Sequence, residues 1–184
     1  MLDATGNITQ NESDVKRLVK NCFSDLFAKD SVCKDCVDEM TNHVPSLSCG
    51  QRQALEKPLT LKELSMALNS FERGKAPGID GLPVEFSTAF WDILGPEVLL
   101  VLQESLHSGI LPLSCRRTMV CLLPKSDDLR QIKNWCPISL PCSDYKLLSK
   151  VLANRLKLVI GTLVHPDQSY CVPGRSISDN IFLN

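Results

Sequence analysis

The sequence contains no long hydrophobic segment, since its apolar runs fall far short of the roughly 20 residues that a membrane-spanning helix requires. The first residues, Met-Leu-Asp-Ala-Thr-Gly-Asn, lack the basic segment and apolar core typical of a secretory signal. We therefore expect no membrane partner and an intracellular location, in the cytoplasm, the nucleus or both. A hydrophobic content of 43% and a net charge of -1 argue against a disordered chain.

The nine cysteines are odd in number and scattered, which does not suit a disulfide framework in an intracellular chain. Cys33, Cys36, His43 and Cys49 have the spacing Cys-x2-Cys-x6-His-x5-Cys, and a Cys-x2-Cys pair is a common half of a tetrahedral zinc site. The later spacings are wider than in a nucleic-acid-binding zinc knuckle, and neither glycine nor an aromatic residue separates the paired cysteines. We therefore expect reduced thiols and no bound metal ion.

Charge is distributed unevenly along the chain. Residues 1–113 contain 10 Lys and Arg against 16 Asp and Glu, a net charge of -6, whereas residues 114–184 contain 10 against 5, a net charge of +5. A basic C-terminal part predicts a polyanionic partner such as nucleic acid. The same charges are equally compatible with a solvated surface.

Residues 1–58 are expected to form a helical connector and linker. Apolar residues recur at helical spacing within residues 11–29, which predicts a helix that packs on the rest of the protein. They are Val15, Leu18, Val19, Cys22, Leu26 and Phe27. Residues 45–58 are polar and bounded by proline, so we predict a linker there.

Residues 59–184 are expected to form a second, helix-rich region. Thr60 and Glu63 have the spacing of a capping box, which predicts a helix that ends near Gly74. Residues 75–83, Lys-Ala-Pro-Gly-Ile-Asp-Gly-Leu-Pro, predict a tight loop because glycine can adopt positive φ and proline fixes φ. Pro83 and Pro96 are each placed to open a helix, and Gly109 is placed to end the second one.

A strand, a polar turn and a second strand are predicted next. Residues 116–123 are apolar and β-branched and end at Pro124, residues 125–134 are polar, and residues 135–140 can return as a strand. Because Pro137 cannot donate to a ladder, that second strand is expected to be an edge strand or an irregular one. These elements and the helices predict an α+β fold with a small antiparallel sheet.

A basic amphipathic helix is predicted after the hairpin. Asp144 is expected to cap it, because a carboxylate can accept the free backbone N–H groups of the first turn. Its predicted apolar face comprises Tyr145, Leu148, Leu152, Leu156 and Val159. Lys146, Lys150 and Lys157 lie off that face, toward solvent or a polyanion.

Four ordered stretches of residues 60–184 form a recognisable set. They are the loop 75–83 followed by Glu85 and Phe86, Leu-Leu-Pro-Lys at 122–125 with Asn-Trp-Cys-Pro-Ile-Ser-Leu at 134–140, Asp-Tyr-Lys at 144–146 with Ala-Asn-Arg-Leu at 153–156, and the run from Asp167 through Gly174 and Arg175 to Ile181. This set resembles the reverse transcriptases of long interspersed elements, the non-LTR retrotransposons. Cys136 departs from the pattern, because the family has Arg there.

The resemblance implies that residues 59–184 are an incomplete reverse transcriptase domain, comprising the fingers and the start of the palm. In that family, palm carboxylates downstream of the Asp-Asn-Ile run hold the Mg²⁺ ions of the complete enzyme. We therefore expect no catalytic residue, no cofactor and no polymerisation in this chain alone. The palm and thumb portion that it lacks is expected as a partner in the complete protein.

The resemblance also implies roles for individual residues. Lys125 and Arg175 are implied to bind nucleotide, with Arg175 anchoring a loop near the template and the nucleotide. A triphosphate is best held by a Lys charge together with an Arg fork, and the thiol of Cys136 offers only a weak donor in place of that fork.

Further basic residues are candidates for weak, sequence-independent contact with an RNA or DNA template, because phosphate contacts position a protein without specifying sequence. They are Arg130, Lys133, Lys146, Lys150 and Arg155. The alternative is an ordinary solvated surface. Asp127 and Asp128 are interpreted as a solvated turn, because adjacent side chains on a strand point to opposite faces and do not share a metal ion.

Two hypotheses about function remain. One is a fragment of a reverse transcriptase that grips template and nucleotide. The other is a co-opted or vestigial interaction module that binds RNA or a protein partner.

Overall fold

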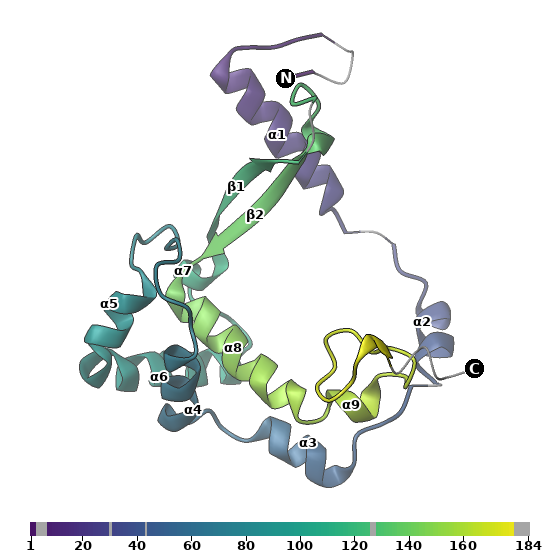
Figure 1. The fold of residues 1–184 in the computed structure, drawn as a ribbon, viewed down its shortest axis with the longest axis vertical. Coiled ribbons are helices and arrows are strands. Elements are labelled where there is room, and N and C mark those ends of the chain that lie inside the picture. The colour runs from purple at the N-terminus through teal and green to yellow at the C-terminus, as the bar shows by residue number, and fades with distance from the viewer. Residues whose placement is uncertain (3–6, 30, 43, 126–127, 179–184) are drawn as a thin grey trace. The chain divides into compact units, whose positions relative to one another are not determined.

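The computed structural model describes residues 1–2, 7–29, 31–42, 44–125 and 128–178. The fold is α+β: helices dominate, and two strands form an antiparallel hairpin (Figure 1). Contacts divide the chain into one unit of Met1–Val37 with Met119–Leu140 and a second unit of Asp38–Thr118 with Pro141–Asn184. Within the described ranges, no helix combines the length and the hydropathy needed to cross a bilayer.

The first unit contains a helix and the hairpin. Its elements are α1 (Glu12–Leu26), β1 (Thr118–Pro124), the 3-10 turn η1 (Ile132–Asn134) and β2 (Trp135–Pro141). Asn11 starts α1 by accepting the Ser13 backbone N–H at 3.0 Å. Both predicted strands are present, although the first begins two residues later than expected.

The apolar stripe of α1 faces the hairpin. Val15, Val19 and Phe23 are half-buried and line a groove of about 820 Å³ together with Val120 and Leu122 of β1. At the C-terminal end of the stripe, Phe27 lines the same groove and stacks on Phe23, but Leu26 is 67% and Phe27 75% exposed. The predicted packing of this helix is therefore only partial in its last turn.

The remaining elements are all helical. They are α2 (Lys34–Thr41), α3 (Cys49–Glu56), α4 (Leu61–Asn69), α5 (Val84–Ala89), α6 (Trp91–Ser108), α7 (Leu113–Arg116), α8 (Ser143–Lys157) and α9 (Ile160–Leu163). Helices α3 to α9 belong to the second unit, whose core forms where α4 packs on α6 and α8. Each fully buried leucine in such a core contributes about 1.5–3 kcal/mol. The core residues are Leu59, Leu64, Ala67, Leu68, Val84, Leu102, Leu147, Leu148 and Val151.

Helix boundaries confirm some predictions and correct others. The Thr60–Glu63 capping box is present, and Gly109 ends α6 in the left-handed conformation with φ 71°. Pro96 does not open a helix but lies inside α6, which already begins at Trp91. The predicted linker 45–58 contains α3, because Ser48 and Gln51 form a second capping box that the sequence analysis overlooked.

Helix α8 begins at Ser143, so its N-cap lies two residues earlier than predicted and Asp144 is not the cap. Cys142 holds the extended N-cap position and makes no side-chain cap bond, so Asp144 falls inside the first turn. The Asp144 carboxylate accepts the thiol of Cys115 at 3.3 Å instead. Burial, and then this carboxylate, raises the pKa of Cys115 to about 12.

The buried face of α8 is also rotated from the predicted one. Leu148 is buried as expected, as is Val159 just beyond the helix, whereas Tyr145 is 36% and Leu156 48% exposed. Leu147, Val151 and Arg155 complete the buried face. Periodicity alone does not reveal this face, because an arginine in an amphipathic helix is expected on the polar side.

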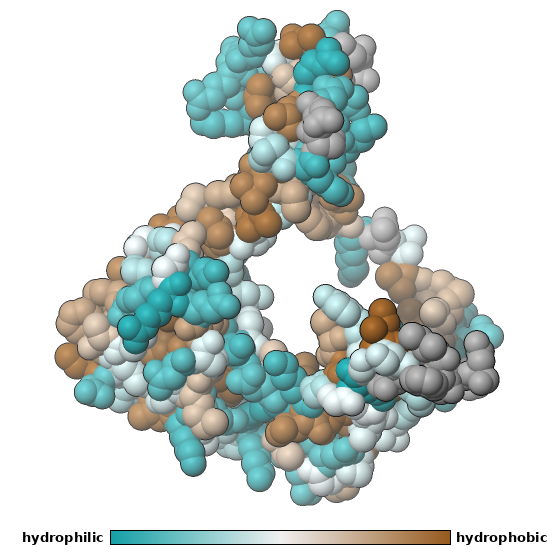
Figure 2. All heavy atoms as spheres, viewed as in Figure 1, coloured by the Kyte–Doolittle hydropathy of each residue, from teal (hydrophilic) through white to brown (hydrophobic). Residues whose placement is uncertain are grey.

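Apolar side chains remain on the surface over α5 and α6, where Figure 2 shows brown patches. Phe86, Phe90, Ile93 and Leu100 are 38–73% exposed. Exposed apolar patches of this kind favour association with further protein.

Candidate nucleic-acid interface

The turn of the hairpin is organised by Asp128. Its carboxylate accepts the Arg130 Nε–H at 2.9 Å and the Gln131 side-chain amide at 2.8 Å, and its backbone carbonyl accepts the Asn134 side-chain amide at 2.8 Å. The hydrogen bond from Arg130, followed by that from Gln131, lowers the pKa of Asp128 to about 2. Asp128 is therefore an ionised structural residue of the turn, whereas Asp127 lies outside the described residues.

Basic side chains flank the described part of this turn. The Lys125 backbone N–H donates to the Asn134 carbonyl at 2.7 Å. The side chains of Lys125 and Lys133 are both exposed. Arg130 is also exposed, but it shares its charge with Asp128. Cys136 is the second residue of β2 and is exposed, so it lies next to the same turn. This is the residue that stands where the similar reverse transcriptases have Arg.

The lysines of α8 differ from one another. Lys146 donates from Nζ to the Ala76 carbonyl at 3.2 Å, so it contacts the loop 75–83. Lys150 is half-buried on the same helix. The loop is held again by Ser143, whose hydroxyl donates to the Leu82 carbonyl at 3.1 Å. The tight loop predicted from glycine and proline thus packs against the start of α8.

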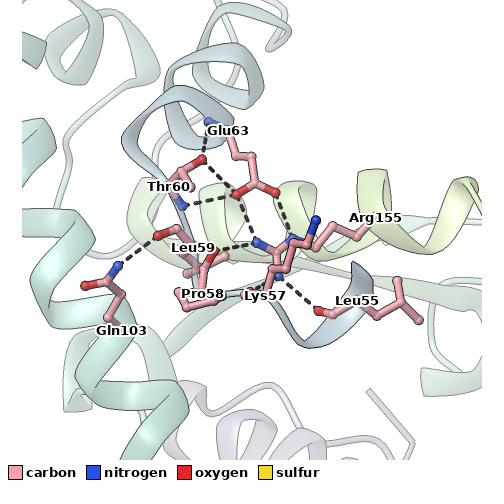
Figure 3. Close-up of polar contacts among 8 residues, drawn as sticks. All are labelled: Leu55, Lys57, Pro58, Leu59, Thr60, Glu63, Gln103 and Arg155. Carbon is pink, nitrogen blue, oxygen red and sulfur yellow. Dashed lines mark hydrogen bonds and ion pairs between the residues drawn. The ribbon is translucent and has the colours of Figure 1, made fainter. Parts of the chain in front are cut away.

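Arg155 lies in a polar cluster between α8, α4 and the segment before α4 (Figure 3). Its Nε and Nη2 donate to the two carboxylate oxygens of Glu63 at 2.8 and 2.9 Å. Its remaining N–H groups donate to the backbone carbonyls of Leu55, Lys57 and Pro58. All five donors of the guanidinium are engaged, and the side chain is only 10% exposed.

This cluster gives Arg155 a structural role that the sequence analysis did not foresee. Its five N–H groups are all taken within the protein, which leaves Arg155 no donor for a template phosphate. The hydrogen bond from Arg155, outweighing the effect of burial, lowers the pKa of Glu63. Glu63 also keeps its capping contacts with Thr60, so one carboxylate starts α4 and ties it to α8.

Arg175 holds the segment that follows α9 through hydrogen bonds to four backbone carbonyls. One terminal nitrogen donates to the carbonyls of His165 and Gln168 at 2.6 and 2.9 Å, and the other donates to those of Gly161 and Val164 at 2.9 and 3.1 Å. Arg175 therefore anchors the loop that contains it, as the resemblance implied. Its proximity to nucleotide stays a prediction.

The structure brings the predicted site residues together in two groups. Lys125, Arg130 and Lys133 gather at the hairpin turn in the first unit, and Lys146, Lys150 and Arg155 lie along α8 in the second. Sequence reasoning missed Asp128 as the organiser of the turn and Glu63 as the partner of Arg155. The Asp-x-Arg spacing was an available signal for the first, but no local pattern pointed to the second.

The described residues contain no group of three or more His, Cys, Asp or Glu side chains that could hold a metal ion. Cys33, Cys36 and Cys49 are exposed free thiols, and His43 lies outside the described ranges. The expectation that this set binds no metal stays a prediction.

Comparison with known proteins relates the chain to mobile genetic elements. It is 45% identical over 178 residues to the "Transposon TX1 uncharacterized 149 kDa protein" of Xenopus laevis, a match that covers 97% of this chain and 14% of that protein. It is 30% identical over 112 residues to the "Retrovirus-related Pol polyprotein from type-1 retrotransposable element R2" of Popillia japonica, covering 61% of this chain and 15% of that protein. The chain thus spans about a seventh of these relatives' length. No protein-family model matches it.

Proposed function

Since this chain is related to the proteins of non-LTR retrotransposons, we propose that it is the part of a reverse transcriptase that grips the template and the incoming nucleotide. The observation that carries the proposal is the hairpin turn, where Lys125 and Lys133 present exposed ammonium groups around a frame fixed by Asp128. An ordered frame lowers the entropic cost of holding those charges against a phosphate backbone. Lys150 supplies a further cationic position in the second unit.

The proposed grip depends on salt. If Lys125, Arg130, Lys133 and Lys150 each neutralise one phosphate of single-stranded RNA, log K falls with log[salt] at a slope of about -3, following about -0.7 per contact. Lys125→Glu with Lys133→Glu is expected to flatten the slope by about 1.4, and Lys150→Glu alone by about 0.7. Titration of a labelled single strand at several salt concentrations measures these slopes.

The matched control is Arg52→Glu with Lys62→Glu, which makes the same change in net charge at two exposed residues outside the proposed surface. It should weaken binding without altering the slope by more than a few tenths. Equal slopes in the hairpin variant and this control would show that the turn is only a solvated surface. Binding that is insensitive to salt would favour the alternative of a co-opted or vestigial interaction module that binds RNA or a protein partner.

Binding a template does not by itself catalyse nucleotide addition, and we propose that this chain alone is catalytically inactive. Two-metal phosphoryl transfer requires carboxylates that hold two ions about 3.5–4 Å apart. The ionised Asp128 is engaged by Arg130 and Gln131 and is unsuited to that task. Primer extension on an RNA template with Mg²⁺ or Mn²⁺ is expected to match a no-protein control, and extension above it would contradict this.

A further inference from the structure

Two exposed cysteines lie at the start of α2, outside the proposed nucleic-acid surface. Cys33 immediately precedes the helix, and its carbonyl accepts the Val37 backbone N–H at 3.2 Å, which is the first bond of the helical ladder. Cys33 therefore holds the N-cap position, where a side-chain acceptor meets free backbone N–H groups. Cys36 follows within the first turn.

The two cysteines lie one helical turn apart. Residues three apart lie on the same face of a helix, so the start of α2 places the side chains of Cys33 and Cys36 on one side of it. Ideal helix geometry separates Cα atoms three residues apart by about 5 Å, which lies within the range of about 4.4–6.8 Å usual for disulfides. A bond between the two sulfurs thus requires little movement of the backbone. Both residues are exposed and accessible to a reagent.

The environment of Cys33 also favours its thiolate. The backbone N–H of Cys36, then the Cys36 thiol and the backbone N–H of Asp35, donate to the Cys33 sulfur and lower its pKa. A thiolate is the form that attacks disulfides, and helix N-termini lower thiol pKa values in other proteins.

We propose that Cys33 and Cys36 form a redox-active dithiol that small disulfides such as oxidised glutathione convert into an intramolecular disulfide bond. The Cys33 thiolate attacks one glutathione sulfur, forming a mixed disulfide and releasing one glutathione thiolate. Cys36 loses its proton and attacks the Cys33 sulfur, forming the internal bond and releasing the second glutathione. The two protein thiols lose two electrons and two protons in total, and one oxidised glutathione becomes two reduced molecules.

The test uses the full chain in buffers of increasing oxidised-to-reduced glutathione ratio, followed by mass spectrometry and peptide mapping. The expected product has lost two hydrogens, with the bond mapped between Cys33 and Cys36. Cys36→Ser is expected to stop at the mixed disulfide on Cys33, and Cys33→Ser is expected to form no internal bond. Cys136→Ser, which removes an exposed thiol elsewhere, is the matched control and should behave as the unaltered chain does.

A second readout is the rate of alkylation by limiting iodoacetamide at neutral pH, which is expected to be several-fold higher at Cys33 than at the exposed Cys49 and Cys136. Three results would overturn the proposal. The first is the absence of an internal disulfide at every glutathione ratio. The second is an equal yield of internal disulfide in Cys36→Ser, which would have to join other cysteines. The third is one zinc ion per chain that is lost in Cys36→Ser. The last result would make these thiols metal ligands.

Discussion

Replacing Arg155 by alanine is expected to lower the free energy of unfolding by about 3–5 kcal/mol, the range for removing one partner of a buried ion pair. The variant removes the two guanidinium donors from the Glu63 carboxylate, which keeps only its contacts with Thr60, and removes the donors of the Leu55, Lys57 and Pro58 carbonyls. Because Glu63 is 32% exposed and regains some hydration, the loss should lie toward the lower end of that range. Urea unfolding followed by circular dichroism measures it.

Two variants separate this cluster from a general effect of charge. Lys157→Ala removes a cation from the same helix at an exposed position and is expected to change stability by no more than about 0.5 kcal/mol. Glu63→Gln removes the ion pair but keeps the three carbonyl contacts, so its loss should be smaller than that of Arg155→Ala. A loss below about 1 kcal/mol in Arg155→Ala would show that water replaces the guanidinium at little cost.

The ion pair between Glu63 and Arg155 also makes the free energy of unfolding depend on pH. The folded-state pKa of Glu63 is lowered, chiefly by the hydrogen bond from Arg155, so folding favours the ionised carboxylate. This contribution to stability is complete above the ordinary Glu pKa of about 4.3 and is lost as the pH falls through the lower folded-state value. Arg155→Ala should lack this part of the acid destabilisation, so its stability difference from the unaltered chain should shrink below about pH 4.

Gly78→Ala is expected to destabilise the second unit by about 1–3 kcal/mol or more, the usual cost of overpacking. A Cβ atom at this position would lie 2.6 Å from the Cys142 nitrogen and 2.7 Å from the Pro141 carbonyl carbon. Both are backbone atoms at the start of α8, so they cannot move aside as a flexible side chain can. The flanking contacts of Lys146 and Ser143 also hold the loop in place.

Gly50→Ala provides the matched control, because Gly50 lies in α3 with nothing within 4 Å of an added Cβ. That variant is expected to be neutral or more stable by about 0.5–1 kcal/mol, since alanine favours a helix over glycine. Thermal unfolding of both variants measures the difference. Equal stability in Gly78→Ala and Gly50→Ala would mean that the loop 75–83 does not pack tightly on α8.

Local signals in the sequence were sufficient for several elements. The Thr60–Glu63 capping box starts α4, and Gly109 ends α6 because it accepts a left-handed conformation. The two apolar segments on either side of a polar turn form β1 and β2. Each of these signals acts between residues close in the chain, so periodicity and turn chemistry reveal it. Pro96 was misassigned because a proline near a helix start suits the first turn but does not require it.

The sequence by itself determined the α+β class, most helices, the hairpin and the relation to non-LTR retrotransposon proteins. Only the tertiary structure decided what Arg155 does, because its partner Glu63 and the carbonyls of Leu55, Lys57 and Pro58 lie more than 90 residues away in the chain. An arginine on a basic helix has the same sequence signature whether it meets a phosphate or a buried carboxylate. Packing of α8 on α4 buried that side of the helix, and burial favours a paired guanidinium over a solvated one.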